Sequence, residues 1–174
     1  KLSYSVPTGV GAARRFVSVG LRLDLDDCTA RQLIVNSTGD DSATDAAEDG
    51  CDTGGTVGGA PECTLRAAIE AVNANGGGEI TFDIDAGGTP TIELGRGLPA
   101  VTQSTVIDAT SQPGGRVAVN GPNTVTALTL GGGTSVVKGL VIQGVDRAIA
   151  ITGGTGHRIE GNRGGTNAEG TAAV

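Results

Sequence analysis

The part of the chain after Glu79 is a series of short apolar segments separated by Gly, Asn, Pro and Thr turns, and this pattern constrains the fold most. The expected strands read ITFDI, TIEL, STVIDA, VAVNG, ALTLG, VVKGLVIQG, AIAIT and HRIEGN. Apolar residues recur at about 20–23 residues, a period typical of solenoids. The two recurring series are Ile107, Leu128, Ile149 and Val119, Ile142, Ile159. Because several strands fit into each period and no helix intervenes, the pattern predicts an all-β parallel β-helix.

Composition favours a thin, repetitive core. The 174 residues include 31 Gly but only two Phe, one Tyr and no Trp. Val, Ile, Leu and Ala must therefore fill the interior, which suits stacked strands better than a thick sandwich. High glycine content is also typical of disorder, but the regular apolar spacing argues against that interpretation.

Charge and hydropathy argue against two classes of partner. The formal net charge is −7 at pH 7, and an acidic surface repels phosphate backbones, which disfavours nucleic acid. No apolar run approaches the roughly 18 residues of a membrane span. The chain begins at Lys1, and we expect it to be a processed or excised piece of a longer precursor.

The stretch CTLRAAIEAVNAN, residues 63–75, is the one clear helix signal. Thr64 is the expected N-cap, and glycines 76–78 are expected to end the helix. The apolar stripe consists of Leu65, Ala68, Ile69 and Val72. A solenoid exposes bare core and unpaired strand edges at its termini. The helix is therefore predicted to cover the N-terminal end of the strands as a lid, with its stripe inward.

Two of the three cysteines, Cys51 and Cys63, bracket the glycine-rich loop CDTGGTVGGAPEC. We expect a disulfide between them; the alternative is a metal-binding thiolate pair, which the single His and the absence of a Cys-x-x-Cys spacing disfavour. A disulfide implies an oxidising compartment, hence secretion. Cys28 remains, either as a buried thiol or as a link to another chain.

The loop before Cys51 is acidic. Its candidate metal-ligating residues are Asp40, Asp41, Asp45, Glu48, Asp49 and Asp52. The favoured interpretation is a solvated acidic loop. The alternative is a calcium site, because Ca²⁺ takes six to eight oxygen ligands in flexible loops; the spacing of an EF-hand is absent.

The chain divides into two parts. Residues 32–174 form the capped β-helix, with the cap loop and helix at about 40–76 and the repeats at about 79–174. Residues 1–31 form a strand-like extension, because RRFVSVGLRLDLDD alternates apolar and polar residues. Residues 12–27 either add an edge strand to a neighbouring subunit, which generates a head-to-tail filament, or fold back onto their own strands.

The text LIVNSTGDDSATDAAEDGC followed by ECTLRAAIEAVNA resembles the CSLREA-type N-terminal domain of secreted bacterial β-helix proteins. The stretches IELGRGLPAVTQSTVIDATSQPGG and GNRGGTNAEGTAA resemble the repeats found beside that motif, so the resemblance covers about residues 32–174. It implies a right-handed parallel β-helix, secretion, and surface or adhesin-like parent proteins. One departure is Gly164, which stands where an isoleucine usually faces the core.

No residue is assigned a catalytic role, and no cofactor is expected apart from the calcium alternative. Polysaccharide lyases and hydrolases of related fold need a base or paired carboxylates. The candidates are Asp83, Asp85, Glu93, Asp108, Asp146, Arg147, His157, Arg158 and Glu160. The favoured function is a non-enzymatic extracellular structural or adhesive protein, a subunit of a surface layer or filament that binds itself or another extracellular protein. The alternative is a polysaccharide-active, pectate-lyase-like enzyme or a carbohydrate-binding module.

Overall fold

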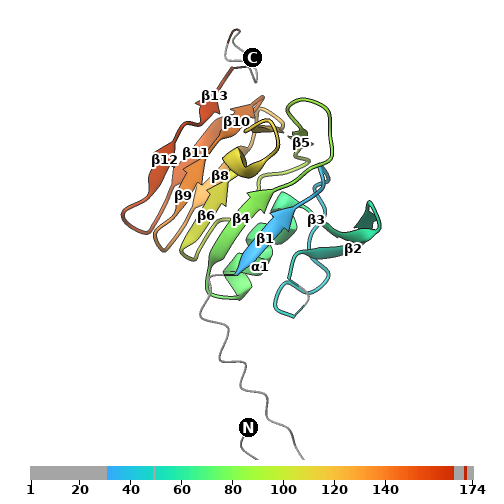
Figure 1. Ribbon diagram of the computed structural model, residues 1–174. Helices are drawn as coiled ribbons and strands as arrows, with labels where there is room; N and C mark the ends of the chain where they lie inside the picture. Colours follow the sequence, from blue (N-terminus) through green and yellow to red (C-terminus); the bar gives the residue numbers. More distant parts are fainter. Residues whose placement is uncertain (1–30, 49, 167–170, 172–174) are drawn as a thin grey trace, which may run out of the picture.

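The structure is a computed structural model that describes residues 31–48, 50–166 and 171. Within these residues the protein is mostly β-sheet with one α-helix, and three of its four sheets are built from parallel strands (Figure 1). The predicted strand in residues 12–27 lies outside the described residues.

The largest sheet has five parallel strands in the order β1–β4–β6–β9–β12. Their bounds are Gln32–Val35 (β1), Gly78–Phe82 (β4), Thr105–Asp108 (β6), Val136–Lys138 (β9) and Arg158–Glu160 (β12). Spatial order follows chain order, so each strand lies beside the previous one and points the same way. Parallel neighbours need a crossover connection, and the chain therefore leaves this sheet and returns to it four times.

The crossovers, together with the residues after the last strand of this sheet, contribute the other two parallel sheets. The second sheet has the order β13–β10–β7–β5, and the third pairs β11 with β8. Their bounds are Thr91–Glu93 (β5), Val117–Asn120 (β7), Thr126–Leu130 (β8), Leu140–Gln143 (β10), Arg147–Ile151 (β11) and Arg163–Gly164 (β13). We call the three parallel sheets together the strand stack. A 3-10 turn, Ala109–Ser111, follows β6.

Aliphatic side chains from the three sheets meet in one core. In the largest sheet, pairing aligns Ile80, Ile107 and Val137, and all three are fully buried. In the second sheet, Ile92 and Val119 are aligned and buried in the same cluster. The prediction of short strands around a thin aliphatic core is confirmed.

The predicted repeat series are half right. Leu128 is aligned with Ile149, and Val119 with Ile142, as expected. Ile107 is aligned with Val137 instead of Leu128, and Ile159 is also aligned with Val137. The early returns to the largest sheet are longer than the expected period, 27 residues from Ile80 to Ile107 and 30 from Ile107 to Val137. Because the prediction assumed one uniform period, it grouped residues that belong to different sheets.

Helix α1, Leu65–Ala74, begins and ends where the sequence predicted. The Thr64 hydroxyl accepts a hydrogen bond from the Ala67 N–H at 3.1 Å, which satisfies one of the free donors of the first turn. After the helix, Gly77 has φ +114°, and a Cβ there would lie 2.3 Å from the Ser104 carbonyl oxygen. Only glycine fits this close approach to the next strand connection.

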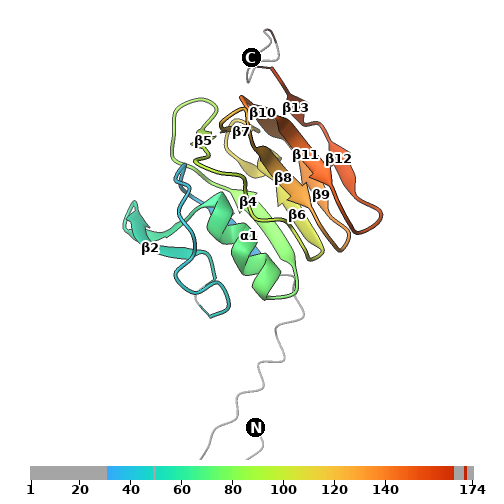
Figure 2. The ribbon, with the colours of Figure 1, turned by 180° about the vertical axis from the view of Figure 1, so that it is seen from behind.

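Helix α1 lies at the β1 end of the strand stack, against β1 and β4 (Figure 2). The predicted stripe of Leu65, Ala68, Ile69 and Val72 is buried. Arg66, Ala67 and Ala71 are buried as well, because segments 36–48 and 95–102 cover the opposite side of the helix. No helix within the described residues has the length and apolar character needed to cross a membrane.

The structure adds an antiparallel hairpin that the sequence interpretation treated as a loop. It consists of β2 (Asp52–Val57) and β3 (Ala60–Cys63). The turn residues Gly58 and Gly59 both have positive φ, as a type I′ hairpin turn requires. Glycine-rich composition hid this hairpin, because glycine is a poor strand former.

Candidate functional site

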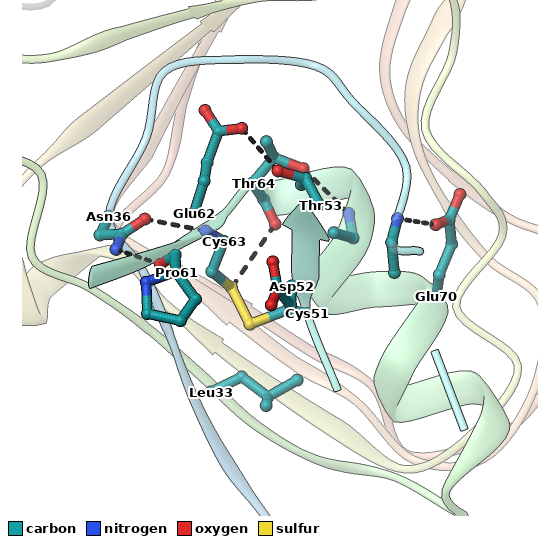
Figure 3. Close-up of a disulfide and its surroundings, with 12 residues drawn as sticks. Leu33, Asn36, Cys51, Asp52, Thr53, Pro61, Glu62, Cys63, Thr64 and Glu70 are labelled. Carbon is teal, nitrogen blue, oxygen red and sulfur yellow. Dashed lines mark hydrogen bonds between the residues drawn. A yellow bond between two sulfur atoms is a disulfide. The ribbon is translucent and has the colours of Figure 1, made fainter. Parts of the chain in front are cut away.

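The two ends of the strand stack differ, and the β1 end is closed by the hairpin and a disulfide (Figure 3). Cys51 and Cys63 are bonded, with their Cα atoms 4.9 Å apart, so the predicted disulfide is confirmed. The Ser37 and Thr53 hydroxyls donate to the two carboxylate oxygens of Glu62, at 2.5 and 2.6 Å. These bonds fix the hairpin against the segment that follows β1.

A buried arginine joins the same end to the next part of the stack. The Arg66 side chain is 2 % exposed, and its guanidinium donates to both carboxylate oxygens of Asp40 at 2.9 Å. It also donates to the carbonyl oxygens of Asp40, Arg96 and Gly97. The sequence interpretation missed this cluster, although a polar residue inside an apolar helix segment was the available signal. It placed Asp40 in the acidic loop, with calcium binding as the alternative.

The acidic residues described in this loop make local hydrogen bonds. Asp45 accepts hydrogen bonds from the N–H groups of Ala47 and Glu48, and Asp52 accepts one from Gly54. Within residues 31–48 and 50–166, no three His, Cys, Asp or Glu side chains form a group that could hold a metal ion.

Asp49 lies outside the described residues, so the calcium site, with Asp41 and Glu48 among its ligands, stays a prediction. Melting temperatures measured with calcium and with a chelator distinguish that site from a solvated loop.

The catalytic candidates near the last strands are engaged locally. Asp146 forms an ion pair with its neighbour Arg147 at 3.6 Å. Arg158 and Glu160 pair along β12, with Arg158 Nε 2.6 Å from Glu160 Oε1. His157 accepts from the Ser135 N–H through Nδ1 at 3.1 Å, and its Nε2 lies 2.9 Å from the Gly153 carbonyl oxygen. This histidine therefore bridges two backbone segments.

The remaining candidates are dispersed. Asp83 and Asp85 are exposed after β4, and Glu93 accepts a hydrogen bond from Asn120 at 2.7 Å. Asp108 lies on the outer face of the largest sheet, opposite Lys138, with an Oδ2–Nζ distance of 2.9 Å. None of these carboxylates is hydrogen-bonded to another of the candidate residues within the described residues.

The contact between Asp108 and Lys138 shifts the pKa of both side chains. Burial raises the pKa of Asp108, but hydrogen bonds from Thr110 and Lys138 outweigh burial, so the pKa of this carboxyl lies below its usual value. The hydrogen bond to Asp108 raises the pKa of Lys138.

Asp108→Asn is expected to lower the free energy of unfolding at pH 7. The difference in this free energy between wild type and variant is expected to shrink as the pH falls. A carboxyl with a lowered folded pKa stabilises above its unfolded pKa of about 3.9, and this contribution is lost as the pH falls through the folded value. At alkaline pH the contribution of Lys138 is lost as the pH rises through its raised pKa. Urea unfolding at pH 7, 4 and 2.5 checks this, and a difference that is constant with pH contradicts it.

The other end of the stack presents apolar side chains to solvent. β11, β12 and β13 are the last strands of their sheets in the described part of the chain, and we call them the open end. Ile159 is 44 % exposed, whereas Val137, its partner in register, is fully buried. Ile151 is 56 % exposed beside the fully buried Leu130. These side chains have the inward register, and no strand within residues 31–166 covers them.

A glycine at a core position leaves a pocket at the open end. Gly164 is aligned with Ile142, as its predicted core position requires. An open pocket of ≈ 600 Å³ lies there, and its lining includes Ile142, Val145, Ala148 and Gly164. An added Cβ at Gly164 would lie 3.6 Å from the Ala148 Cβ, so the position has room for a side chain.

Comparison of the chain with protein-family models, with curated proteins and with solved structures finds no match. The candidate site is therefore defined by the geometry of the molecule: one end closed by a helix, a hairpin and a disulfide, and another end with exposed core positions.

Proposed function

We propose that the chain forms a right-handed parallel β-helix of the CSLREA type and acts as a non-enzymatic extracellular structural or adhesive protein. In this proposal it is a subunit of a surface layer or of a head-to-tail filament. Parallel pairing in chain order and the cysteine-led helix after a disulfide hairpin support the fold assignment.

The contrast between the two ends carries the functional proposal. In one column of inward residues, exposure is 8 % at Leu33, zero at Ile80, Ile107 and Val137, and 44 % at Ile159. The helix and hairpin protect the first position, whereas the last position and its neighbour Ile151 are exposed. Apolar surface together with unpaired strand edges favours association with a further strand.

The disulfide supports an extracellular location, because such bonds persist in oxidising compartments and are rare in the cytosol. A second copy or another extracellular protein is the partner that an apolar strand edge favours.

A polysaccharide-active enzyme is the second candidate, and no contact in the described residues favours it. A hydrolase needs two carboxylates on either side of a substrate bond, and a lyase needs a free base. Instead, His157 hydrogen-bonds two backbone groups, and Arg158 pairs with Glu160. A screen of acidic polysaccharides with calcium for new unsaturated ends tests this candidate, and a signal lost in His157→Ala would replace our proposal.

The structural role predicts concentration-dependent assembly through the open end. Replacing Ile151 and Ile159 together by lysine is expected to weaken association at least about tenfold, because charge then occupies the apolar contact. The matched control is Ile34→Lys, since Ile34 is 51 % exposed but lies on the outer face of β1. Sedimentation velocity measures the oligomers, and negative-stain imaging shows whether they are linear.

A wild-type chain that stays monomeric at all accessible concentrations contradicts the assembly role. An equal effect of Ile34→Lys and of the double variant contradicts the use of the open end.

A further inference from the structure

Strand β12 gives the open end a specific charge pattern. Arg158 and Glu160 point to the outer face, with side chains 67 % and 49 % exposed, and Ile159 between them has the inward register. Within the described residues, β12 pairs with β9 on one side and with no strand on the other. An added strand would complement this edge if it placed an apolar residue opposite Ile159, a negative charge opposite Arg158 and a positive charge opposite Glu160.

The sequence outside the described residues contains a segment with this pattern of charges. Residues 21–25 read Leu-Arg-Leu-Asp-Leu. In an antiparallel pair with Leu23 opposite Ile159, Arg22 lies opposite Glu160 and Asp24 lies opposite Arg158. Directly opposed residues share a face of the sheet, and opposite charges there are favourable. A parallel pair in the same alignment would oppose like charges, so the charges select the antiparallel orientation.

The length of the connection favours a second molecule as donor. In this alignment Leu25 lies opposite His157, in the row that also holds Arg31, Gly78, Thr105 and Ser135. Five strand spacings separate Arg31 from the added strand, about 24 Å. The six residue steps from Leu25 to Arg31 span at most about 22 Å even when fully extended.

We propose that residues 21–25 of a second copy add an antiparallel strand to the outer edge of β12, with Leu23 against Ile159. This inference rests on the assembly role proposed above and names the segment that carries it. The pairing joins the N-terminal part of one molecule to the open end of the next, which is a heterologous contact and propagates as a filament.

Charge swaps test the pairing without changing composition or net charge. The first variant exchanges the charges on β12, Arg158→Glu with Glu160→Arg, and keeps the ion pair within the strand. The second exchanges those of the segment, Arg22→Asp with Asp24→Arg. Each swap alone is expected to weaken association at least about tenfold, and the combination is expected to restore it to within about threefold of wild type.

Sedimentation velocity over a concentration series distinguishes assembly itself from the proposed strand pairing. A wild type that never assembles removes the proposed role itself. A wild type that assembles, with swaps that have no effect or a combination that restores nothing, overturns the strand pairing and leaves assembly in place.

Cross-linking provides a readout that does not depend on affinity. In a Cys28→Ser background, one chain carries Leu23→Cys and a second carries Ile159→Cys, and the mixture is expected to give a disulfide-linked dimer on a non-reducing gel. The matched control replaces Ile159→Cys by Ile151→Cys, which lies at the same end in another sheet. Equal cross-linking of the control, or a bond that forms only when both cysteines are in one chain, overturns the proposal.

Discussion

Arg66→Ala is expected to lower the free energy of unfolding by about 3–5 kcal/mol, the loss typical of a buried ion pair that keeps one partner. The side chain is 2 % exposed and donates to the Asp40 carboxylate and to three backbone carbonyl oxygens. Removing it takes a donor from each of these acceptors in a largely buried site, although Asp40 Oδ2 keeps the hydrogen bond from the Gly95 N–H. The variant also detaches α1 from the Arg96–Gly97 backbone, so the cap and the next part of the stack lose their link.

Two variants separate this effect from a general loss of charge. Arg96→Ala removes an exposed arginine in the adjoining segment and is expected to cost less than about 1 kcal/mol. Arg66→Lys is expected to fall between the two, since an ammonium group cannot bind a carboxylate in a bidentate way. Urea unfolding monitored by circular dichroism gives the three values. A loss at Arg66→Ala no larger than that at Arg96→Ala contradicts the role of this cluster.

Local signals predicted most of the secondary structure. The spacing of Leu65, Ala68, Ile69 and Val72 follows the helical period, and Thr64 caps the first turn in the structure as expected. The segments STVIDA and ALTLG are flanked by turn residues, and they form β6 and β8. These features depend on residues that are close in sequence, so a single sequence contains them.

Strand register could not be predicted in the same way. Leu128 and Val137 are both aliphatic and lie 21 and 30 residues after Ile107, yet only Val137 is paired beside it. The choice depends on how many residues each crossover uses, and the 3-10 turn after β6 and the loop after β7 lengthen one crossover. Apolar periodicity does not measure the length of such irregular connections.

The polar contacts were the hardest part of the site to predict. Asp40 was grouped with the neighbouring acidic residues because they are close in sequence, whereas its partner Arg66 is 26 residues away. Glu62 likewise binds Ser37 and Thr53 from two different segments. Long-range hydrogen bonds of this kind leave no periodic pattern in the chain. The exposure of Ile159 was equally hidden, because its sequence environment resembles that of the buried strands.

The closed end also depends on a covalent bond, and replacing Cys51 and Cys63 together by serine is expected to cost about 3 kcal/mol, equivalent to a decrease of about 6–12 °C in melting temperature. The bond joins two cysteines that are 12 residues apart in sequence and closes the loop that contains the β2–β3 hairpin. Cys63 directly precedes the helix cap Thr64. Hydrogen exchange is expected to increase in residues 52–63 and in the first turn of α1, with less change in β7 and β10. A reductant is expected to lower the melting temperature of the wild type by a similar amount and to leave that of the double serine variant unchanged. If reduction leaves the wild type unaffected, the hydrogen bonds of Glu62 hold the hairpin without the disulfide, and the closure of this end is a non-covalent property of the fold.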